Sequence, residues 1–296
     1  MIADEARSER NNSEATYNQV RTKQRDETRQ GSMLKLHILA SGSRGNATIV
    51  ENDQTGRGVL IDCGICKRDF LARCDEARFN PANIDAVLIT HDHGDHTKGL
   101  GVVMRGLAKM GRQPLVYAAD ETVRASKAVQ DATSACGTRN FHPEECLTAA
   151  GMSIFPFATS HDAAVSFGFR FEASGDTVGF MTDTGIVTPQ AHAHLADVRL
   201  LALESNHDPK MLHEGPYPYV VKQRIASDKG HLSNEQAAEE LASLLGSRLQ
   251  AVAAMHVSEN NNEYDLALRG FRAVMEREGC AARVICGYQG RLSTLA

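Results

Sequence analysis

Short apolar runs, bounded by small or polar residues, recur along the chain from about residue 34 onward. They are rich in Val, Ile, Leu and Phe and end at Gly, Asp, Ser or His, which is typical of buried β-strands. The runs predict strands over residues 34–40, 48–52, 58–64, 84–90, 114–119, 153–160, 165–173, 177–183, 198–205, 251–258 and 282–288. The first two flank a turn of small residues, SGSRGN (41–46).

Helical patterns stand between several of these strands. The segment 233–246 begins with a capping box, Ser233 with Gln236 three residues later, and a second helix is predicted over 262–279. No repeat or Pro-rich linker divides residues 33–296. Because the strands are too many for a simple doubly wound sheet, we expect one α/β domain with two sheets covered by helices.

Residues 1–32 are polar, mixed in charge and poor in apolar side chains, which predicts a disordered N-terminal extension. This segment lacks the apolar core of a secretory signal peptide, and no run approaches the roughly 18 apolar residues that span a bilayer. We therefore expect a cytoplasmic protein without membrane contact. The seven cysteines are dispersed and read as reduced thiols, and the single CxxC, Cys63 to Cys66, favours a structural role.

Charge and aromatic content limit the ways in which this chain could bind nucleic acid. The formal net charge is −5 and aromatic residues make up 5% of the chain. Binding by positive charge alone and a stacking surface rich in aromatics are therefore disfavoured. A nucleic-acid substrate is not excluded, because two bound divalent cations would make a site locally positive.

Side chains suited to metal binding follow the ends of five predicted strands. Strand 84–90 leads into HDHGDH (91–96), and later strands end at His161, Asp183, Glu204 and His256. One histidine after a strand is most often a satisfied polar residue, but this repeated placement indicates a shared site. Imidazole and carboxylate are ligands of zinc, manganese and iron, and Gly94 is expected to let the loop turn tightly between two ions.

HDHGDH resembles the HxHxDH signature of the metallo-β-lactamase fold. LASGSRGNATIVE, SHDAAVSFGF, MTDTG, LALESNHDPKML, GHLSNEQAA and MHVSENN are together similar to the YycJ/WalJ-like exonuclease group, which is related to ribonuclease Z and RNase J. The resemblance covers essentially all of residues 33–296. It implies a metallo-β-lactamase αββα sandwich, with two mixed sheets covered by helices, that serves as the catalytic domain.

The resemblance also implies a site with two divalent metal ions, Zn²⁺ or Mn²⁺, with iron as a further option. One ion would be held by His91, His93 and His161, the other by Asp95, His96 and His256, and both by Asp183. His231 of GHLSN would act as a proton donor rather than a ligand, with Glu204 orienting it. Asp95 counts among the catalytic residues together with this pair.

These roles predict a phosphodiesterase, most specifically a DNA exonuclease. Two ions lower the pKa of a bridging water and present hydroxide to phosphorus. Protonated His231 could donate to the departing 3′ oxygen, because a histidine hydrogen-bonded to a carboxylate keeps a defined tautomer and a raised pKa. The expected partner is a nucleic acid, DNA before RNA.

Several further residues have two readings. Ser41, Ser43 and Asn46 could bring donors to a phosphate, although a plain hairpin turn has the same composition. Lys222 and Arg224 could contact a nucleic-acid backbone or simply form a solvated helix face. Asp92 could orient a ligating histidine or stabilise a turn. The remaining histidines considered are expected at the surface: His142, His192, His194, His207 and His213.

Other functions are compatible with a metal site of this kind. The main alternative is a small-molecule hydrolase that cleaves a lactone, thioester or lactam. Asp183, where a β-lactamase proper carries Cys, argues against a lactamase, and the predicted Glu204–His231 pair favours phosphodiester chemistry. His93 disfavours a di-iron redox protein, and a proton donor disfavours a non-catalytic module. The sequence leaves open the metal, DNA or RNA, cleavage polarity and oligomeric state.

Overall fold

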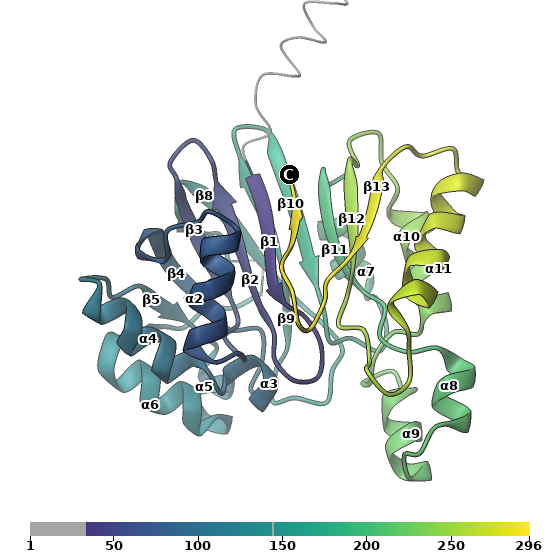
Figure 1. Cartoon of the computed structure of the whole chain (residues 1–296), viewed down its shortest axis with the longest axis horizontal. Coiled ribbons are helices and arrows are strands. Elements are labelled where there is room, and N and C mark those ends of the chain that lie inside the picture. The colour runs from purple at the N-terminus through teal and green to yellow at the C-terminus, as the bar shows by residue number, and fades with distance from the viewer. Residues whose placement is uncertain (1–33, 144) are drawn as a thin grey trace, which may run out of the picture. The chain divides into compact units, whose positions relative to one another are not determined.

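The computed structural model describes residues 34–143 and 145–296, so the predicted N-terminal extension (1–32) lies outside the described residues. Within them, two seven-stranded sheets lie face to face (Figure 1). The first has the order β14-β1-β2-β3-β4-β5-β6 and the second β13-β12-β11-β10-β9-β8-β7.

The first sheet is built from β1 (Leu34–Ala40), β2 (Ala47–Asn52), β3 (Arg57–Ile61), β4 (Ile84–Leu88), β5 (Leu115–Tyr117), β6 (Thr138–Arg139) and β14 (Ser293–Leu295). The second is built from β7 (Leu147–Ala149), β8 (Met152–Ala158), β9 (Phe167–Ala173), β10 (Asp176–Met181), β11 (Leu200–Glu204), β12 (Ala251–Met255) and β13 (Arg283–Cys286).

Helices cover the outer face of each sheet, and short helices close the connecting loops. Those near the first sheet are α2 (Lys67–Glu76), η1 (Pro81–Asn83), α3 (Gly94–Thr97), α4 (Leu100–Lys109), α5 (Asp120–Ala125) and α6 (Lys127–Cys136). Those that follow are α7 (Pro189–Leu195), α8 (Pro209–Glu214), α9 (Tyr219–Ile225), α10 (Asn234–Leu244) and α11 (Tyr264–Arg277). This arrangement confirms the predicted αββα sandwich.

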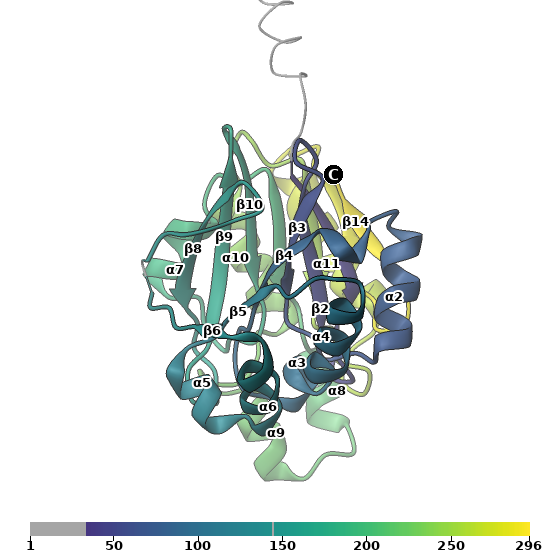
Figure 2. The same ribbon diagram turned by 90° about the vertical axis from the view of Figure 1, so that its left-hand side faces the viewer.

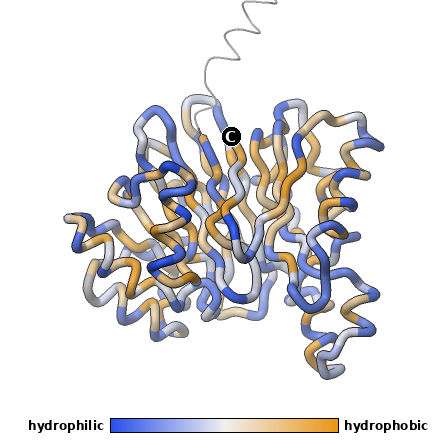
Figure 3. Tube along the Cα trace, viewed as in Figure 1, coloured by the Kyte–Doolittle hydropathy of each residue, from blue (hydrophilic) through white to orange (hydrophobic). Residues whose placement is uncertain are grey.

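Apolar residues alternate between layers of the sandwich. Leu36 and Ile38 of β1 face the second sheet, whereas Leu39 of the same strand packs with the α2 and α4 helices. A third apolar cluster joins the second sheet to α7, α10 and α11. Figure 3 shows the apolar strands inside and hydrophilic residues in the outer loops. Burial on both faces explains why the strands are continuous apolar runs rather than alternating ones.

The predicted elements are largely those observed. The capping box of α10 is confirmed: the Ser233 hydroxyl accepts from the Gln236 N–H at 3.1 Å, and the Gln236 side chain accepts from the Ser233 N–H at 2.9 Å. The eleven predicted strands are all present: β1 has the predicted bounds, β2, β3, β8 and β10 begin one residue earlier than predicted, and most strands end sooner. Three more strands, β6, β7 and β14, have only two or three residues and carry no periodic signal.

Two further observations concern the helices and the cysteines of the described residues. No helix there combines the length and the apolar character needed to cross a membrane. The seven cysteines all lie there as free thiols. Cys63 is buried and Cys66 is exposed, and neither belongs to a group of metal-ligating side chains in the described ranges.

One buried ion pair joins the two sheets. Arg199 donates to both oxygens of Asp176, at 2.6 and 2.9 Å, and to the carbonyl of Leu34 at 2.6 Å. The Leu34 N–H donates to the same carboxylate at 2.9 Å. Burial alone would raise the pKa of Asp176, but the hydrogen bonds from Arg199 and Leu34 lower it below its ordinary value.

Asp176→Asn should therefore destabilise the fold by roughly 3–5 kcal/mol, because it leaves a buried guanidinium without its countercharge. Urea unfolding measures the change, with Asp131→Asn in the exposed Lys127 pair as the control, expected to cost about 0–1 kcal/mol. Since the folded pKa of Asp176 is lowered, its contribution is complete above the ordinary carboxyl pKa and lost as pH falls through the folded value. Equal stabilities of variant and parent at neutral pH would contradict this account.

Candidate metal centre

Strand ends from both sheets meet at one edge of the sandwich. β8 and β10 both pair antiparallel with β9, and β10, β11 and β12 run parallel, so the C-terminal ends of these four strands lie at the same edge. They carry His161, Asp183, Glu204 and His256. β4 of the first sheet contributes the loop 91–96. The structure brings all five contributions together, as the strand-end pattern predicts.

Loop 91–96 is fixed by the segments packed against it. The Asn46 N–H donates to the carbonyl of Asp95 at 2.8 Å. Gly64 is required beside it, since a Cβ there would lie 1.5 Å from the same carbonyl oxygen. Gly94, in contrast, opens α3 without a positive φ and with free space around it. The predicted dependence of the loop on Gly94 is therefore wrong, and Gly64 is the glycine that the close approach needs.

Two groups of side chains offer ligand atoms within 4.8 Å of one another: His91, His93 and His161 form the first, and Asp95, His96 and His256 form the second. Asp183 lies between the groups. Its Oδ1 is 3.8 Å from Nε2 of His161 and 3.6 Å from Nε2 of His256, and its Oδ2 is 3.4 Å from Nε2 of His96. A carboxylate in this position can bridge two ions.

The donor atoms fit divalent cations. Nε2 of His91 and Oδ2 of Asp183 are buried and make no hydrogen bond. An unsatisfied buried polar atom costs about 1–3 kcal/mol, which coordination of a cation would offset. Imidazole nitrogen mixed with carboxylate oxygen suits zinc, manganese and iron.

Three of the proposed ligand histidines are fixed in orientation by an oxygen partner on Nδ1, and a fourth, His256, has the Asn206 side-chain amide 3.1 Å from its Nδ1. The partners are Thr90 Oγ1 for His91 (2.9 Å), the Asp62 carboxylate for His96 (2.7 Å) and the Gly230 carbonyl for His161 (3.0 Å). Such contacts set the tautomer so that Nε2 can face a metal ion. At His96 the Asn46 amide nitrogen also lies 3.0 Å from Nε2. His93 differs, because its Nδ1 faces Nε2 of His161 at 3.3 Å.

The electrostatics of the cluster hold its carboxylates ionised and divide its histidines, with the pKa lowered at His91 and His161 and raised at His96 and His256. Burial, followed by the neighbouring His96, lowers the pKa of His91 well below its ordinary value. Burial alone would raise the pKa of Asp183, but the surrounding histidines, His256 first, hold it well below its ordinary value. Burial likewise opposes the lowered pKa of Asp95, which His96 and His256 produce. Burial would lower the pKa of His96 and His256, but Asp183 first raises that of His96 well above its ordinary value and that of His256 to about 10. A cation at the second group would therefore have to displace a proton from these two rings.

Three residues at the site adopt a left-handed backbone at the end of a strand. The φ angles are 57° at Asp62, 56° at Asp183 and 52° at His256. Residues other than glycine adopt this conformation uncommonly, and the surrounding structure must hold them there. The Glu204 carboxylate does so for Asp183 by accepting its N–H at 3.0 Å, and the Ser41 hydroxyl does so for His256 by accepting its N–H at 2.7 Å.

Asp62 belongs to the site although the sequence reasoning did not select it. Its Oδ2 accepts from the Thr90 hydroxyl at 2.8 Å and faces Nδ1 of His96 at 2.7 Å, and its Oδ1 accepts the Thr90 N–H at 2.8 Å. The signal that could have found it is the one that found Asp183: a carboxylate directly after a buried strand, here VLI before Asp62.

Asp62→Asn should weaken metal binding by roughly 10- to 100-fold, because it removes the carboxylate that orients His96. Competition with a chelator of known affinity measures the loss. Asp92→Asn is the matched control: Asp92 accepts the Ala164 N–H at 2.9 Å, a backbone contact outside the ligand cluster, so its effect should be smaller. Equal losses in the two variants would remove the special role of Asp62.

Glu204 is buried and engages four donors at 3.2 Å or less, and Nδ1 of His256 lies 3.5 Å from its Oε1. Its Oε1 lies 2.9 Å from Nδ1 of His231 and accepts the Asp183 N–H, and its Oε2 accepts the N–H groups of Thr184 at 3.2 Å and Leu232 at 3.0 Å. Burial alone would raise the pKa of Glu204, but His231 lowers it to about 2. Glu204 therefore remains a carboxylate that positions His231, the pairing that the sequence resemblance implied.

The geometry supports a role of His231 as a metal ligand less well than a role as a proton donor. Asp183, Glu204, His231 and His256 also offer atoms within 4.8 Å of one another. Both oxygens of Glu204 already accept hydrogen bonds, however, so this carboxylate is a poor metal ligand. Nδ1 of His231 is occupied by Glu204, which leaves Nε2 for another partner.

The small-residue turn 41–46 acts as a support for the site. Ser41 is buried with its hydroxyl on His256, and the Asn46 amide lies 3.2 Å from Asp95 Oδ2. Most N–H groups of the turn are used within the protein, such as that of Arg44, which donates to the Gln289 side chain at 2.8 Å. The structure thus favours a positioning role for Ser41 and Asn46 over the predicted phosphate contact, whereas Ser43 is exposed.

The two basic candidates lie on α9. Arg224 pairs with Asp162, whose other carboxylate oxygen is 3.4 Å from Nε2 of His161, and Lys222 donates to the His213 carbonyl at 2.7 Å. Arg224 therefore reaches the centre through Asp162, and the end of α9 is joined to it by the His231 N–H, which donates to the carbonyl of Ile225. Their contact with a nucleic-acid backbone stays a prediction.

The five histidines expected at the surface differ in exposure. His142 and His213 are exposed, as predicted. His192 and His194 on α7 are half-buried, with His194 stacked on Phe157 at 5.1 Å between ring centroids. His207 is not a surface residue, since only 3% of it is exposed and burial lowers its pKa to about 4.

Comparison with known proteins agrees with the fold. Residues 57–256 match the family model for the β-lactamase superfamily domain. The chain therefore belongs to the metallo-β-lactamase superfamily, and it is a metal-dependent hydrolase.

Two bacterial exodeoxyribonucleases are similar over most of the chain. YycJ of Bacillus anthracis is 32% identical over 83% of this chain and 90% of that protein. WalJ of Streptococcus pneumoniae is 34% identical over 79% of this chain and 85% of that protein. Among solved structures, YhfI of Bacillus subtilis superposes with a TM-score of 0.65 at 18% identity, covering 88% of this chain and 99% of that one. That last likeness concerns the fold alone.

Proposed function

We propose that this chain is a dinuclear metal-dependent exodeoxyribonuclease. The observation that carries the proposal is the Glu204–His231 pair, 2.9 Å apart, beside Asp183 at the edge of the metal-ligating cluster. A phosphodiester releases an alkoxide, which needs a proton, so a positioned imidazole suits this reaction. The similarity to two exodeoxyribonucleases over about four fifths of the chain supports DNA as the substrate.

Seven side chains would hold the two ions: His91, His93 and His161 the first, Asp95, His96 and His256 the second, and Asp183 both. Zinc and manganese suit this donor set, and iron is compatible with it. When bound, such ions supply an activated water nucleophile and neutralise the oxygens of the phosphate. The burial of His91, His96 and Asp183 keeps these ligands in fixed positions.

His231 would donate the proton to the departing oxygen. Glu204 holds its Nδ1, so Nε2 is the atom that would meet the substrate. Glu204 acts as a positioning residue, because it also accepts the N–H of Asp183 and so fixes the donor relative to the carboxylate shared by the ions.

A panel of substrates tests this proposal. End-labelled single- and double-stranded DNA and RNA are incubated with the Zn²⁺ or Mn²⁺ enzyme, alongside a lactone and a thioester. We expect stepwise shortening of DNA, faster than of RNA, and loss of activity after chelation of the metal. Hydrolysis of the lactone or the thioester without cleavage of any nucleic acid would establish a small-molecule hydrolase instead.

A further inference from the structure

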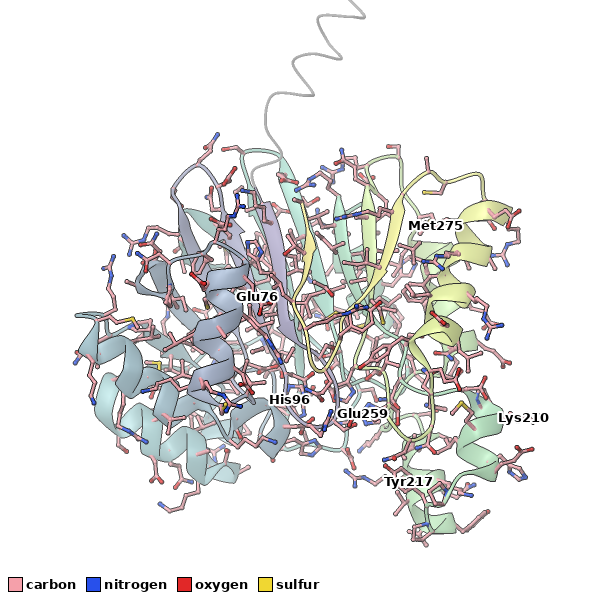
Figure 4. The ribbon with its side chains drawn as sticks, viewed as in Figure 1. Glu76, His96, Lys210, Tyr217, Glu259 and Met275 are labelled. Atoms are coloured by element: carbon pink, nitrogen blue, oxygen red, sulfur yellow. The ribbon has the colours of Figure 1, made fainter. Side chains whose placement is uncertain are left out.

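Residues 207–226, here called the α8–α9 segment, line a cavity of about 300 Å³ next to the metal centre. Two contacts connect the segment to that centre: the hydrogen bond from His231 to Ile225 and the ion pair of Arg224 with Asp162. Figures 1 and 2 show α3, α8 and α9 at the same end of the sandwich. In Figure 4, Tyr217 and Lys210 of this segment lie at the end that also carries His96 and Glu259.

The lining of this cavity combines an apolar surface with a few polar groups. Leu212, Pro209 and Ala226 supply apolar atoms, and Tyr219, Lys222 and His207 supply a ring, a cation and an imidazole. His207 is buried, and its Nδ1 makes no hydrogen bond. The volume is at the lower end of the roughly 300–1,000 Å³ found for small-molecule sites, which is the scale of one nucleotide rather than of a second protein.

α9 exposes apolar side chains at its N-terminal end. None of its residues is buried, and its first two side chains, Tyr219 and Val220, are 74% and 77% exposed. Tyr219 is also part of the cavity wall. Exposed aromatic rings beside a nucleic-acid path commonly stack on unpaired bases.

The charge of residues 207–230 is compatible with the binding of a nucleic-acid strand. Between His207 and Gly230 the basic side chains outnumber the acidic ones, whereas the chain as a whole carries a formal net charge of −5. The basic residues are Lys210, Lys222, Arg224 and Lys229, and the acidic ones are Asp208, Glu214 and Asp228.

We propose that the α8–α9 cavity binds one unpaired nucleobase of the substrate strand, with Tyr219 stacked on the base and Lys222 beside its phosphate. The inference rests on the proposed nuclease function and assigns a substrate subsite to it. A base can enter the cavity only after it leaves the duplex stack. The enzyme therefore takes a single-stranded end in preference to a blunt one.

Abasic substitutions in a single-stranded oligodeoxynucleotide test the subsite. One abasic residue is placed at each of the first few positions from the attacked end, and kcat/KM is compared with that of the complete strand. At one position we expect a loss of about tenfold, within the range of base–aromatic stacking. Tyr219→Ala should abolish this dependence on the base, and Tyr219→Phe should retain it. Val220→Ala, equally exposed on the same helix but outside the cavity lining, should also retain it.

The results that would contradict the subsite differ from those that would contradict the nuclease function. If Tyr219→Ala keeps the parent's preference for a base at every position, the subsite does not exist. The same holds if sedimentation shows a dimer that Tyr219→Ala dissociates while the preference for a base persists, because α9 would then be a subunit interface. Hydrolysis of bis(p-nitrophenyl) phosphate, which has no base, checks the phosphodiesterase separately. If neither that ester nor DNA is cleaved, both proposals fail.

Discussion

His231→Ala should bind both metal ions yet turn over DNA roughly 100- to 10,000-fold more slowly, the usual contribution of a general acid. Nδ1 of His231 contacts Glu204 at 2.9 Å, and Glu204 is buried among backbone donors, so removal of the imidazole leaves the seven proposed ligands in place. Metal content measured beside single-turnover cleavage separates binding from chemistry.

A chemical control distinguishes proton donation from other losses. A strand with sulfur in place of the departing 3′ oxygen needs little protonation, because a thiolate is a much better leaving group. The deficit of His231→Ala should shrink on this substrate, whereas Asp95→Asn, which alters a proposed ligand, should stay impaired. A metal loss in His231→Ala as large as in an Asp183 variant would make His231 a ligand and undo its assignment.

Asp183→Asn should lose metal and activity together. Asparagine is accepted at the φ of 56° that this position requires, so the substitution changes charge and donor strength more than backbone. Because Asp183 stands between both ligand groups, the affinity should fall by more than the roughly 10- to 100-fold that follows the loss of an outer hydrogen-bonding partner.

The matched variant is Asp95→Asn, which touches only the second ligand group. Its Oδ2 lies 3.5 Å from Nε2 of both His96 and His256. Metal content should fall toward one ion per chain in this variant and below one in Asp183→Asn. Full retention of two ions in Asp183→Asn would rule out a bridging carboxylate.

Much of the fold and of the ligand cluster follows from local sequence patterns. Buried strands are apolar on both faces and therefore stand out, and polar side chains directly after them are collected at one edge by the parallel arrangement. β6, β7 and β14 could not be predicted, because two or three residues contain no period. Asp62 follows the same rule as Asp183 and could have been recognised.

The sequence predictions that differ from the structure concern residues whose surroundings come from segments distant in the chain. The need for Gly64 arises from the Asp95 carbonyl, and the burial of Ser41 arises from the N–H of His256, more than 200 residues away. His207 reads as a polar loop residue in the sequence, yet α8 and α9 fold over it. Only the tertiary arrangement determines these environments.

The most direct test of the dinuclear centre is a titration of metal into the metal-free protein, with bound metal and cleavage of end-labelled DNA measured on the same samples. We predict that cleavage remains low through the first equivalent and rises with the second, to a plateau at two ions per chain. Full activity with a single ion bound, or no cleavage of DNA with two ions bound, would contradict the account.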